Sequence, residues 1–188
     1  MVFDELDKRI IENIQRNGRI ALSRMSERVG VSHVAIKRRL DKLRKDDWIN
    51  ISSGFNVEKL NLKLEMVTAE IENYARLNTL LDQFEKCPRT VYLSSFGGSK
   101  IVAIVLGENL STLESVLGNC YLRTKKGVRS STIDIGNPPK YPKFLPIRIV
   151  AKKRRRKTPC GEECRKCSRF SEEKCVGCPS TKYYKGCL

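Results

Sequence analysis

The chain of 188 residues lacks the patterns that mark several classes of protein. It has one histidine and no paired carboxylates, nucleophile beside a base, or glycine-rich phosphate loop, so we expect no enzyme. No run of about 18 apolar residues occurs, which predicts no transmembrane helix and no membrane partner. The stretch from Met1 to Glu5 lacks the apolar centre of a secretory signal, and we therefore expect a cytoplasmic protein.

Acidic side chains are scarce relative to basic ones. The chain has 37 Lys and Arg against 21 Asp and Glu, a net charge of +16. Residues 137–157 hold nine of the basic side chains and no acid, whereas residues 61–136 are nearly neutral. Because such an excess of positive charge attracts anions, we expect a nucleic acid as partner.

Residues 23–42 predict two short helices joined at Gly30. Ser23 and Ser32 stand where a serine hydroxyl accepts a hydrogen bond from a free N–H of a helix's first turn. Gly30 stands where the first helix ends and the backbone turns through a left-handed conformation. This pattern of caps and turn is typical of a helix-turn-helix.

The second of these helices has two faces. Ile36, Leu40 and Leu43 have the spacing of a buried stripe, and most basic residues lie off that stripe. A solvated basic face is the plainer interpretation, but an apolar back and a basic front next to a shorter helix favour a reader of double-stranded DNA. The predicted DNA contacts are Ser23, Ser32, His33, Val34, Lys37, Arg38, Arg39 and Lys42.

Two of these contacts have alternatives. His33 fits equally well as a solvated residue at the start of its helix. Arg39 fits as a brace that pairs with an acid such as Glu27. Both alternatives stay open at the level of the sequence.

A further helix is expected before this pair. Asp4 would cap it with Asp7 as the acidic partner, and Asn17-Gly18 would end it. A short strand over residues 48–51 would then close a winged-type unit. We place the helix-turn-helix domain at residues 1–54 and a linker at residues 55–62.

Residues 63–136 change period. Strands are expected near 64–73, 91–96, 101–106 and 128–135, and helices near 77–84 and 110–117. This order predicts a ferredoxin-like βαββαβ domain for dimerisation and effector binding, within an α+β fold class. Two helices would cover one face of the sheet, so we predict that a second copy covers the other, in a homodimer or larger homo-oligomer.

The helix motifs carry a resemblance to a known family. Leu6-Asp7-Lys8-Arg9-Ile10-Ile11, and Val29-Gly30-Val31-Ser32 followed by Ile36 to Leu43, resemble the Lrp/AsnC family of prokaryotic transcription regulators over about residues 4–136. The resemblance implies a sequence-specific DNA-binding regulator that forms dimers or larger assemblies. An architectural, largely non-specific DNA-binding protein is the alternative.

The resemblance also implies a small-molecule effector at a turn between the second and third strands. The family usually has glycine-x-tyrosine-aspartate there, whereas this chain has Gly97, Gly98, Ser99 and Lys100. Lys100 would repel the ammonium group that an acid would attract. An effector site and a plain hairpin turn therefore remain alternatives.

Residues 137–157 form a proline-rich and then basic connector. Its prolines exclude a helix and favour an extended chain. The six consecutive cations from Lys152 to Lys157 would add DNA affinity that does not depend on sequence.

Residues 158–188 contain six of the eight cysteines. Two Cys-x2-Cys pairs give the spacing of a metal site, and a segment this short needs a staple to fold. We predict a small metal-binding module with the ligands Cys160, Cys164, Cys167, Cys175, Cys178 and Cys187.

Three kinds of chemistry fit these cysteines. The first is zinc on Cys164, Cys167, Cys175 and Cys178, with the outer two as extra ligands. An iron–sulfur cluster is the alternative, and a redox switch or set of disulfides is the third possibility. The layout resembles archaeal regulators that join an Lrp-like reader to a cysteine-rich sensor, which implies control by metal or redox state. Cys87 and Cys120 are expected to be ordinary small buried residues.

Overall fold

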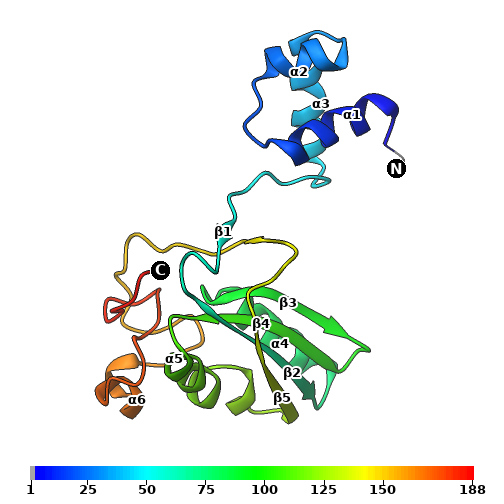
Figure 1. Cartoon of the computed structure of the whole chain (residues 1–188). Coiled ribbons are helices and arrows are strands. Elements are labelled where there is room, and N and C mark those ends of the chain that lie inside the picture. Colours follow the sequence, from blue (N-terminus) through cyan, green and yellow to red (C-terminus); the bar gives the residue numbers. More distant parts are fainter. Residues whose placement is uncertain (1–2) are drawn as a thin grey trace. The chain divides into compact units, whose positions relative to one another are not determined.

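The computed structural model describes residues 3–188 and divides the chain into two compact units (Figure 1). One unit ends at Ser53, one residue before the expected end of the helix-turn-helix domain at residue 54. The other unit begins at Gly54. The expected start of that domain at residue 1 lies outside the described residues. None of the described helices is long and apolar enough to cross a bilayer.

The first unit consists of three helices, α1 (Glu5–Arg16), α2 (Leu22–Val29) and α3 (His33–Lys45). As expected, Asp4 and Asp7 form a capping box at the start of α1. Gly30 ends α2 with φ +77°, a left-handed conformation that other residues rarely adopt. The Ser32 hydroxyl caps α3 by accepting from the Ala35 N–H at 3.2 Å. The buried core consists of Ile10, Met25, Val29 and Ile36.

Two expectations for this unit are wrong. Ser23 is the second residue of α2, and Ala21 occupies the N-cap position without a side-chain hydrogen bond. The expected strand over residues 48–51 is also absent, and within residues 3–53 the described chain has no strand and hence no wing. Instead the Trp48 N–H donates to the Leu43 carbonyl at 2.9 Å, and the Trp48 ring meets the Phe3 ring edge to face. These contacts hold the segment against α3 where no partner strand exists.

The second unit is built on a four-stranded antiparallel sheet. Its elements in chain order are β2 (Lys63–Ile71), α4 (Tyr74–Glu85), β3 (Thr90–Phe96), β4 (Lys100–Gly107), α5 (Leu110–Ser115), the π-helical turn η1 (Val116–Cys120), the 3-10 turn η2 (Leu122–Thr124) and β5 (Val128–Gly136). The strand order β3-β4-β2-β5 is that of the ferredoxin-like βαββαβ domain. The predicted element order is therefore confirmed.

One face of this sheet is covered by α4 and α5 (Figure 1). Val67, Ala103 and Val105 point to that side and pack with Leu80 and Phe84 in the largest buried cluster. The other face carries partly exposed apolar side chains: Met66, Tyr92 and Phe96 have 40%, 44% and 48% of their surface exposed. Leu64 and Leu106 on this second face are buried with Val57 and Leu145, so the sheet has one packed face and one that is open and partly apolar over only part of its area.

The expected linker is part of this second unit. β1 (Phe55–Asn56) pairs antiparallel with β6 (Phe144–Leu145), so residues far apart in sequence form a small second sheet. Val57 and Leu62 are buried beside Leu145 and Ile147. Residues 55–62 are thus anchored rather than free, because their apolar side chains have a core to enter. The start of the connector is anchored in the same way.

The tail contains only short regular elements. They are the 3-10 turn η3 (Cys164–Lys166) and the single helical turn α6 (Ser168–Ser171). The tail belongs to the second compact unit, Gly54–Leu188. The tail is therefore a docked extension of the βαββαβ domain.

The cap at Ser32 yields a direct test. We expect Ser32→Ala to lower the free energy of unfolding of the first unit by about 1 kcal/mol, because the first turn of α3 loses its side-chain acceptor. Ser23→Ala is the matched control and should change it by less than about 0.5 kcal/mol, since Ser23 caps nothing. Trp48, the single tryptophan, reports on this unit in urea denaturation of the full chain followed by fluorescence. Equal effects of the two substitutions would contradict the capping assignment.

Candidate functional site

The exposed face of α3 is a candidate DNA-contacting surface. Val34, Lys37, Arg38 and Lys42 recur at helical spacing, opposite the buried Ile36. All four are exposed, and Val34 has 63% of its surface exposed although it is apolar. Among the described residues, no hydrogen bond or ion pair involves the side chains of the three basic members. Their charges are therefore free for an external anion.

Arg39 lies on a different side of α3 and braces the unit. Its Nη1 lies 2.7 Å from the Asp4 carboxylate and 3.3 Å from that of Asp7, whose side chain is 3% exposed. Hydrogen bonding to the Asp7 N–H, aided by Arg39, holds the pKa of Asp4 below its usual range. The alternative role of Arg39 as a brace thus has structural support, but the partners are in α1 rather than at Glu27. The predicted DNA contact through Arg39 is not supported.

The remaining predicted contacts differ in how free they are. His33 is the exposed first residue of α3, where recognition helices commonly present side chains to bases. The Ser32 hydroxyl is occupied as the cap. Ser23 is exposed on α2 and lines a shallow hollow with Arg24 and Glu27. The structure therefore places Ser23 on a neighbouring helix rather than on the exposed α3 face.

The predicted effector turn is a tight hairpin. Gly97 and Gly98 have φ of +58° and +76°, and the turn joins β3 to β4. The Ile71 N–H donates to the Ser99 carbonyl at 2.7 Å, and Lys100 is exposed at the first position of β4. Phe96 pairs with Lys100, which leaves a three-residue hairpin turn, and glycine adopts the positive φ of such a turn without steric cost. The geometry therefore accounts for these residues as a connection between strands.

The basic connector is only partly free. Lys153 Nζ donates to the Leu188 carbonyl at 2.7 Å and lies 4.3 Å from the centre of the Tyr184 ring. Arg155 forms a backbone bridge with Thr181. Lys152, Arg154 and Arg156 are exposed. The expected extended segment is thus tied to the tail at alternate positions, while the others carry their charge outward.

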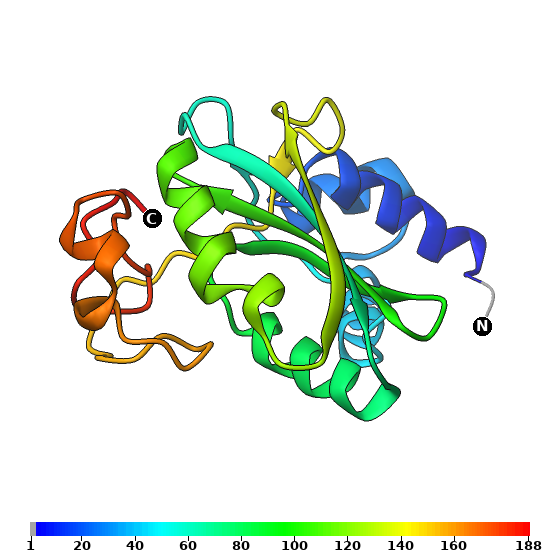
Figure 2. The same cartoon turned by 90° about the horizontal axis from the view of Figure 1, so that it is seen from below.

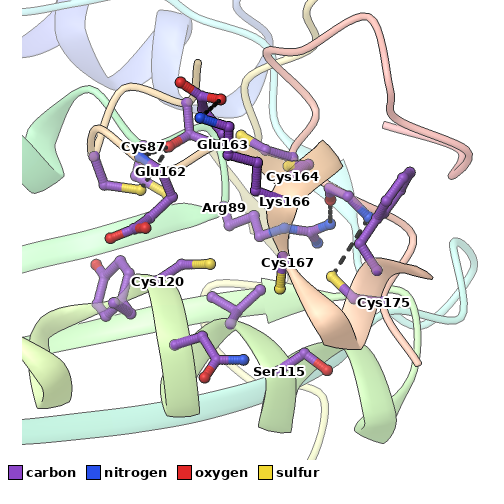
Figure 3. Close-up of a pocket in the computed structure, with 18 of the residues that line it drawn as sticks. Cys87, Arg89, Ser115, Cys120, Glu162, Glu163, Cys164, Lys166, Cys167 and Cys175 are labelled. Carbon is purple, nitrogen blue, oxygen red and sulfur yellow. Dashed lines mark hydrogen bonds and ion pairs between the residues drawn. The ribbon is translucent and has the colours of Figure 1, made fainter. Parts of the chain in front are cut away.

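A cavity of about 540 Å³ lies where the tail meets the βαββαβ domain (Figure 3). Seven of the eight cysteines line it: Cys87, Cys120, Cys160, Cys164, Cys167, Cys175 and Cys178. Cys187 is exposed and does not line this cavity, so the structure does not bring this predicted ligand to the others. Cys87 is buried as expected. Cys120 was also expected to be an ordinary buried residue. It is only partly buried and lies in the cavity wall, a position that the sequence did not predict.

The cysteines reach this cavity from separate elements. Cys120 ends η1, Cys167 ends η3, and Cys175 follows α6. Figure 3 shows the sulfur atoms of these three residues directed into the same space from different sides. All eight cysteines are free thiols in the structure, which does not contain the expected alternative of disulfides.

Polar contacts hold the tail on the domain beside α5 (Figure 2). The Ser111 and Ser115 hydroxyls donate to the Lys174 carbonyl at 2.8 and 3.2 Å. Arg169 Nε donates to the Ser115 hydroxyl at 2.8 Å. At the other rim, Lys125 pairs with Glu162 at 2.7 Å. These contacts flank the cavity on both sides and fix its shape.

Arg89 forms part of the cavity wall and has only 2% of its side chain exposed. It donates to the Glu108 carboxylate at 2.7 Å, to the Leu106 carbonyl at 3.2 Å and to the Gly177 carbonyl at 2.7 Å. Burial alone would lower the pKa of Arg89, but Glu108 raises it above its ordinary value, so the residue is charged. Arg89 Nε is buried and has no hydrogen-bond partner among the described residues.

Burial disfavours the thiolate form of two of the cavity cysteines, Cys120 and Cys178. Burial raises the pKa of Cys120, and neighbouring thiols such as Cys160 raise it further. Burial likewise raises the pKa of Cys178, to about 12. Since metals bind thiolates, each cysteine that binds one must release a proton. Within residues 3–188, no three Cys, His, Asp or Glu side chains converge on a point that could hold a single ion.

The exposed α3 face and the βαββαβ sheet define a helix-turn-helix protein with a ferredoxin-like second domain. Residues 3–44 match the AsnC-type helix-turn-helix domain. A stretch of 75 residues is 43% identical to an HTH-type transcriptional regulator of Pyrococcus furiosus and covers 37% of this chain and 48% of that protein. The chain thus spans about half the length of this curated relative.

Several solved structures share the fold. AsnC of E. coli has a TM-score of 0.63 at 21% identity, covering 74% of this chain and 96% of that one. An ASNC family regulator of Pyrococcus furiosus has a TM-score of 0.59 at 18% identity, covering 76% and 95%. A Neisseria meningitidis transcriptional regulator, solved in complex with L-Met, has a TM-score of 0.63 at 19% identity, covering 72% and 90%.

These comparisons support the Lrp/AsnC resemblance of the sequence motifs. The domain match covers the helix-turn-helix, and the structural likeness shows the fold. The matched proteins are transcriptional regulators and not enzymes, which agrees with the expectation from the sequence.

Arg89 provides a test of how the tail is held. We expect Arg89→Ala to lower the free energy of unfolding of the second unit by about 3–5 kcal/mol, because it leaves a poorly exposed Glu108 carboxylate without its partner. The tail should also become sensitive to trypsin, since the Gly177 carbonyl loses its donor. Urea denaturation followed by far-ultraviolet circular dichroism and timed proteolysis measure the two effects.

Arg165→Ala is the matched control for this experiment. Arg165 is exposed in η3, and among the described residues no hydrogen bond or ion pair involves its side chain. Its loss should change the free energy of unfolding by less than about 0.5 kcal/mol. If Arg89→Ala behaved like this control, Arg89 would not be the anchor of the tail.

Proposed function

We propose that the protein is a dimeric transcription regulator that binds specific DNA sequences through α3 and is controlled through its cysteine-lined cavity. The observation that carries the DNA-binding part is the exposed stripe Val34, Lys37, Arg38 and Lys42 on the second helix of an AsnC-type helix-turn-helix. Its charges have no partner among the described residues, whereas the nearby Arg39 forms ion pairs with Asp4 and Asp7.

The four members of the stripe suit three kinds of contact with DNA. The exposed Arg38 can donate two hydrogen bonds to a guanine, a contact that discriminates by about 1–3 kcal/mol against another base. The exposed Val34 side chain suits the methyl group of thymine, which apolar side chains contact. Lys37 and Lys42 suit phosphates, which fix position without reading sequence. The α3 stripe thus combines one polar and one apolar means of reading bases.

A homodimer follows from the open face of the sheet. Met66, Tyr92 and Phe96 leave apolar surface exposed there, although Leu64 and Leu106 on the same face are buried within the second unit. A second copy packed sheet to sheet would bury these side chains and present two helix-turn-helix units to two half-sites. Dimers or larger assemblies are what the Lrp/AsnC resemblance implies.

The alternative of an architectural DNA-binding protein rests on one observation. Lys152, Arg154 and Arg156 remain exposed on the connector and favour binding that is independent of sequence. The same cations equally serve a specific regulator by strengthening its contact with phosphates. The ratio of specific to random affinity separates the two functions.

Control is proposed at the tail rather than at the hairpin turn. A relative is described in complex with L-Met, but Lys100 of this chain stands at the turn where an acid would be needed for an ammonium group. Seven thiols around one cavity supply a donor set for metal instead. Zinc is the first candidate from the cysteine spacing, with an iron–sulfur cluster as the alternative.

Arg38 gives the sharpest test of sequence reading. An operator is first selected from a random DNA library with the full chain. We expect Arg38→Ala to weaken operator binding about 5- to 150-fold, the equivalent of about 1–3 kcal/mol, and to weaken random-duplex binding much less. Arg123→Ala in the exposed turn η2 removes the same charge from the other unit and should leave the ratio of the two affinities unchanged. Equal losses on both DNAs would reduce Arg38 to a phosphate contact.

The open sheet face gives the test of the dimer. We expect Met66→Glu combined with Phe96→Glu to convert the dimer to a monomer at micromolar concentration, because charges would be buried between the sheets without partners. Tyr74→Glu is the control, since this side chain is 67% exposed at the start of α4. Light scattering after size exclusion measures the mass. A wild-type chain that is already monomeric at this concentration would refute the sheet-to-sheet dimer.

A further inference from the structure

We propose that the cavity holds a polynuclear iron–sulfur cluster whose ligands come from both the tail and the βαββαβ domain. Cys120 supplies the ligand from the domain, and Cys167 and Cys175 supply two from the tail. A fourth thiolate comes from Cys160, Cys164 or Cys178, which line the same cavity. This site deepens the proposed control by metal, which rests on the tail cysteines, and moves it to the junction between tail and domain.

The arrangement of the thiols favours a cluster over a single ion. A zinc ion holds its sulfur ligands at about 2.3 Å, so four of them must converge on one point. Within residues 3–188, no three potential ligands do so. The sulfurs instead surround a space of about 540 Å³. A cluster of several iron and sulfide atoms bridges thiolates that are too far apart for one ion, and four cysteines suffice for it.

Arg89 provides an independent indication of what the cavity receives. Its side chain forms part of the cavity wall and is 2% exposed, and its Nε is a buried donor without a partner among the described residues. An unpaired buried donor destabilises the fold, and an acceptor in the cavity would remove that penalty. Thiolate and sulfide sulfurs of a cluster are negatively charged acceptors, and hydrogen bonds to them are a general feature of such sites. The Gly177 N–H already donates to Cys175 Sγ at 3.4 Å.

The local backbone explains how Cys120 reaches the tail. The helix α5 continues directly into the π-helical turn η1, which ends at Cys120. Such wide turns often mark functional sites, because they shift the residues beyond them out of the regular helix. Figure 3 shows Cys120 directed toward Cys167 and Cys175 across the cavity. A cluster held by these three would tie the tail to the second helix of the regulatory fold.

The test uses the full chain, purified without oxygen and loaded with iron and sulfide. We expect two or more iron atoms per chain with equal acid-labile sulfide and a broad visible absorption band. Cys120→Ser should retain less than a quarter of the wild-type iron. Cys187→Ser is the matched control, since Cys187 lies outside the cavity, and should retain all of it.

A second measurement keeps the proposal testable if Cys120→Ser does not fold. Wild-type chain, loaded or stripped, is treated with iodoacetamide and mapped by mass spectrometry. We expect the Cys120 thiol to be alkylated at least ten times more slowly in the loaded chain, while Cys187 reacts equally in both.

Three results would overturn the site. They are stoichiometric zinc without sulfide, full iron in Cys120→Ser, and equal alkylation of Cys120 in loaded and stripped chain. None of these readouts involves DNA. A chain that carries the cluster but shows no preference for selected DNA would therefore fail the proposed function and leave this site standing.

Discussion

The buried guanidinium of Arg89 determines how the second unit is assembled. A full charge with 2% of its side chain exposed persists only where acceptors surround it. Those acceptors are Glu108 after β4, the Leu106 carbonyl within β4 and the Gly177 carbonyl in the tail. Lifting the tail away would break one of these bonds and open the site to water. The sheet and the tail therefore form one body, and whatever fills the cavity acts on both.

A corresponding ion pair organises the first unit. Arg39 binds Asp4 and Asp7 at the start of α1 and so fixes α3 against that helix. Because this arginine is used internally, the outward stripe of Val34, Lys37, Arg38 and Lys42 keeps a fixed orientation. In each unit, the ion pair of one arginine thus holds the packing in place, and the proposed functional surface lies next to that arginine.

Local signals in the sequence predicted the frame of the structure. Asp4, Gly30 and Ser32 act within one helical turn, so their roles follow from neighbouring residues alone. The βαββαβ order followed from periodicity in the same way. The prediction that Ser23 caps α2 was wrong because capping depends on which residue starts the helix, and periodicity fixes that residue only to within one or two positions. The apolar Val57 and Leu62 were the available sign that residues 55–62 are anchored.

Contacts between segments that are far apart in the chain could not be predicted from the sequence. The partners of Arg39 lie more than thirty positions away, whereas the expected Glu27 was merely near in sequence. Cys120 is forty residues before the first tail cysteine, so no spacing pattern connects them. Conversely, Cys187 shares the run of tail cysteines but lies outside the cavity. Only the docking of the tail sorts the eight cysteines into those that line one space and the one that does not.

In the proposed function, the cavity where the tail docks controls DNA binding by α3. The most direct test is operator affinity of one preparation, measured with the metal bound and after its removal, at constant salt. Coupling between two sites of a protein is typically worth about 1–3 kcal/mol. If the cavity controls DNA binding, we expect the operator Kd to change about 5- to 150-fold, with little change on random duplex. Equal operator Kd for the loaded and the stripped protein would contradict it.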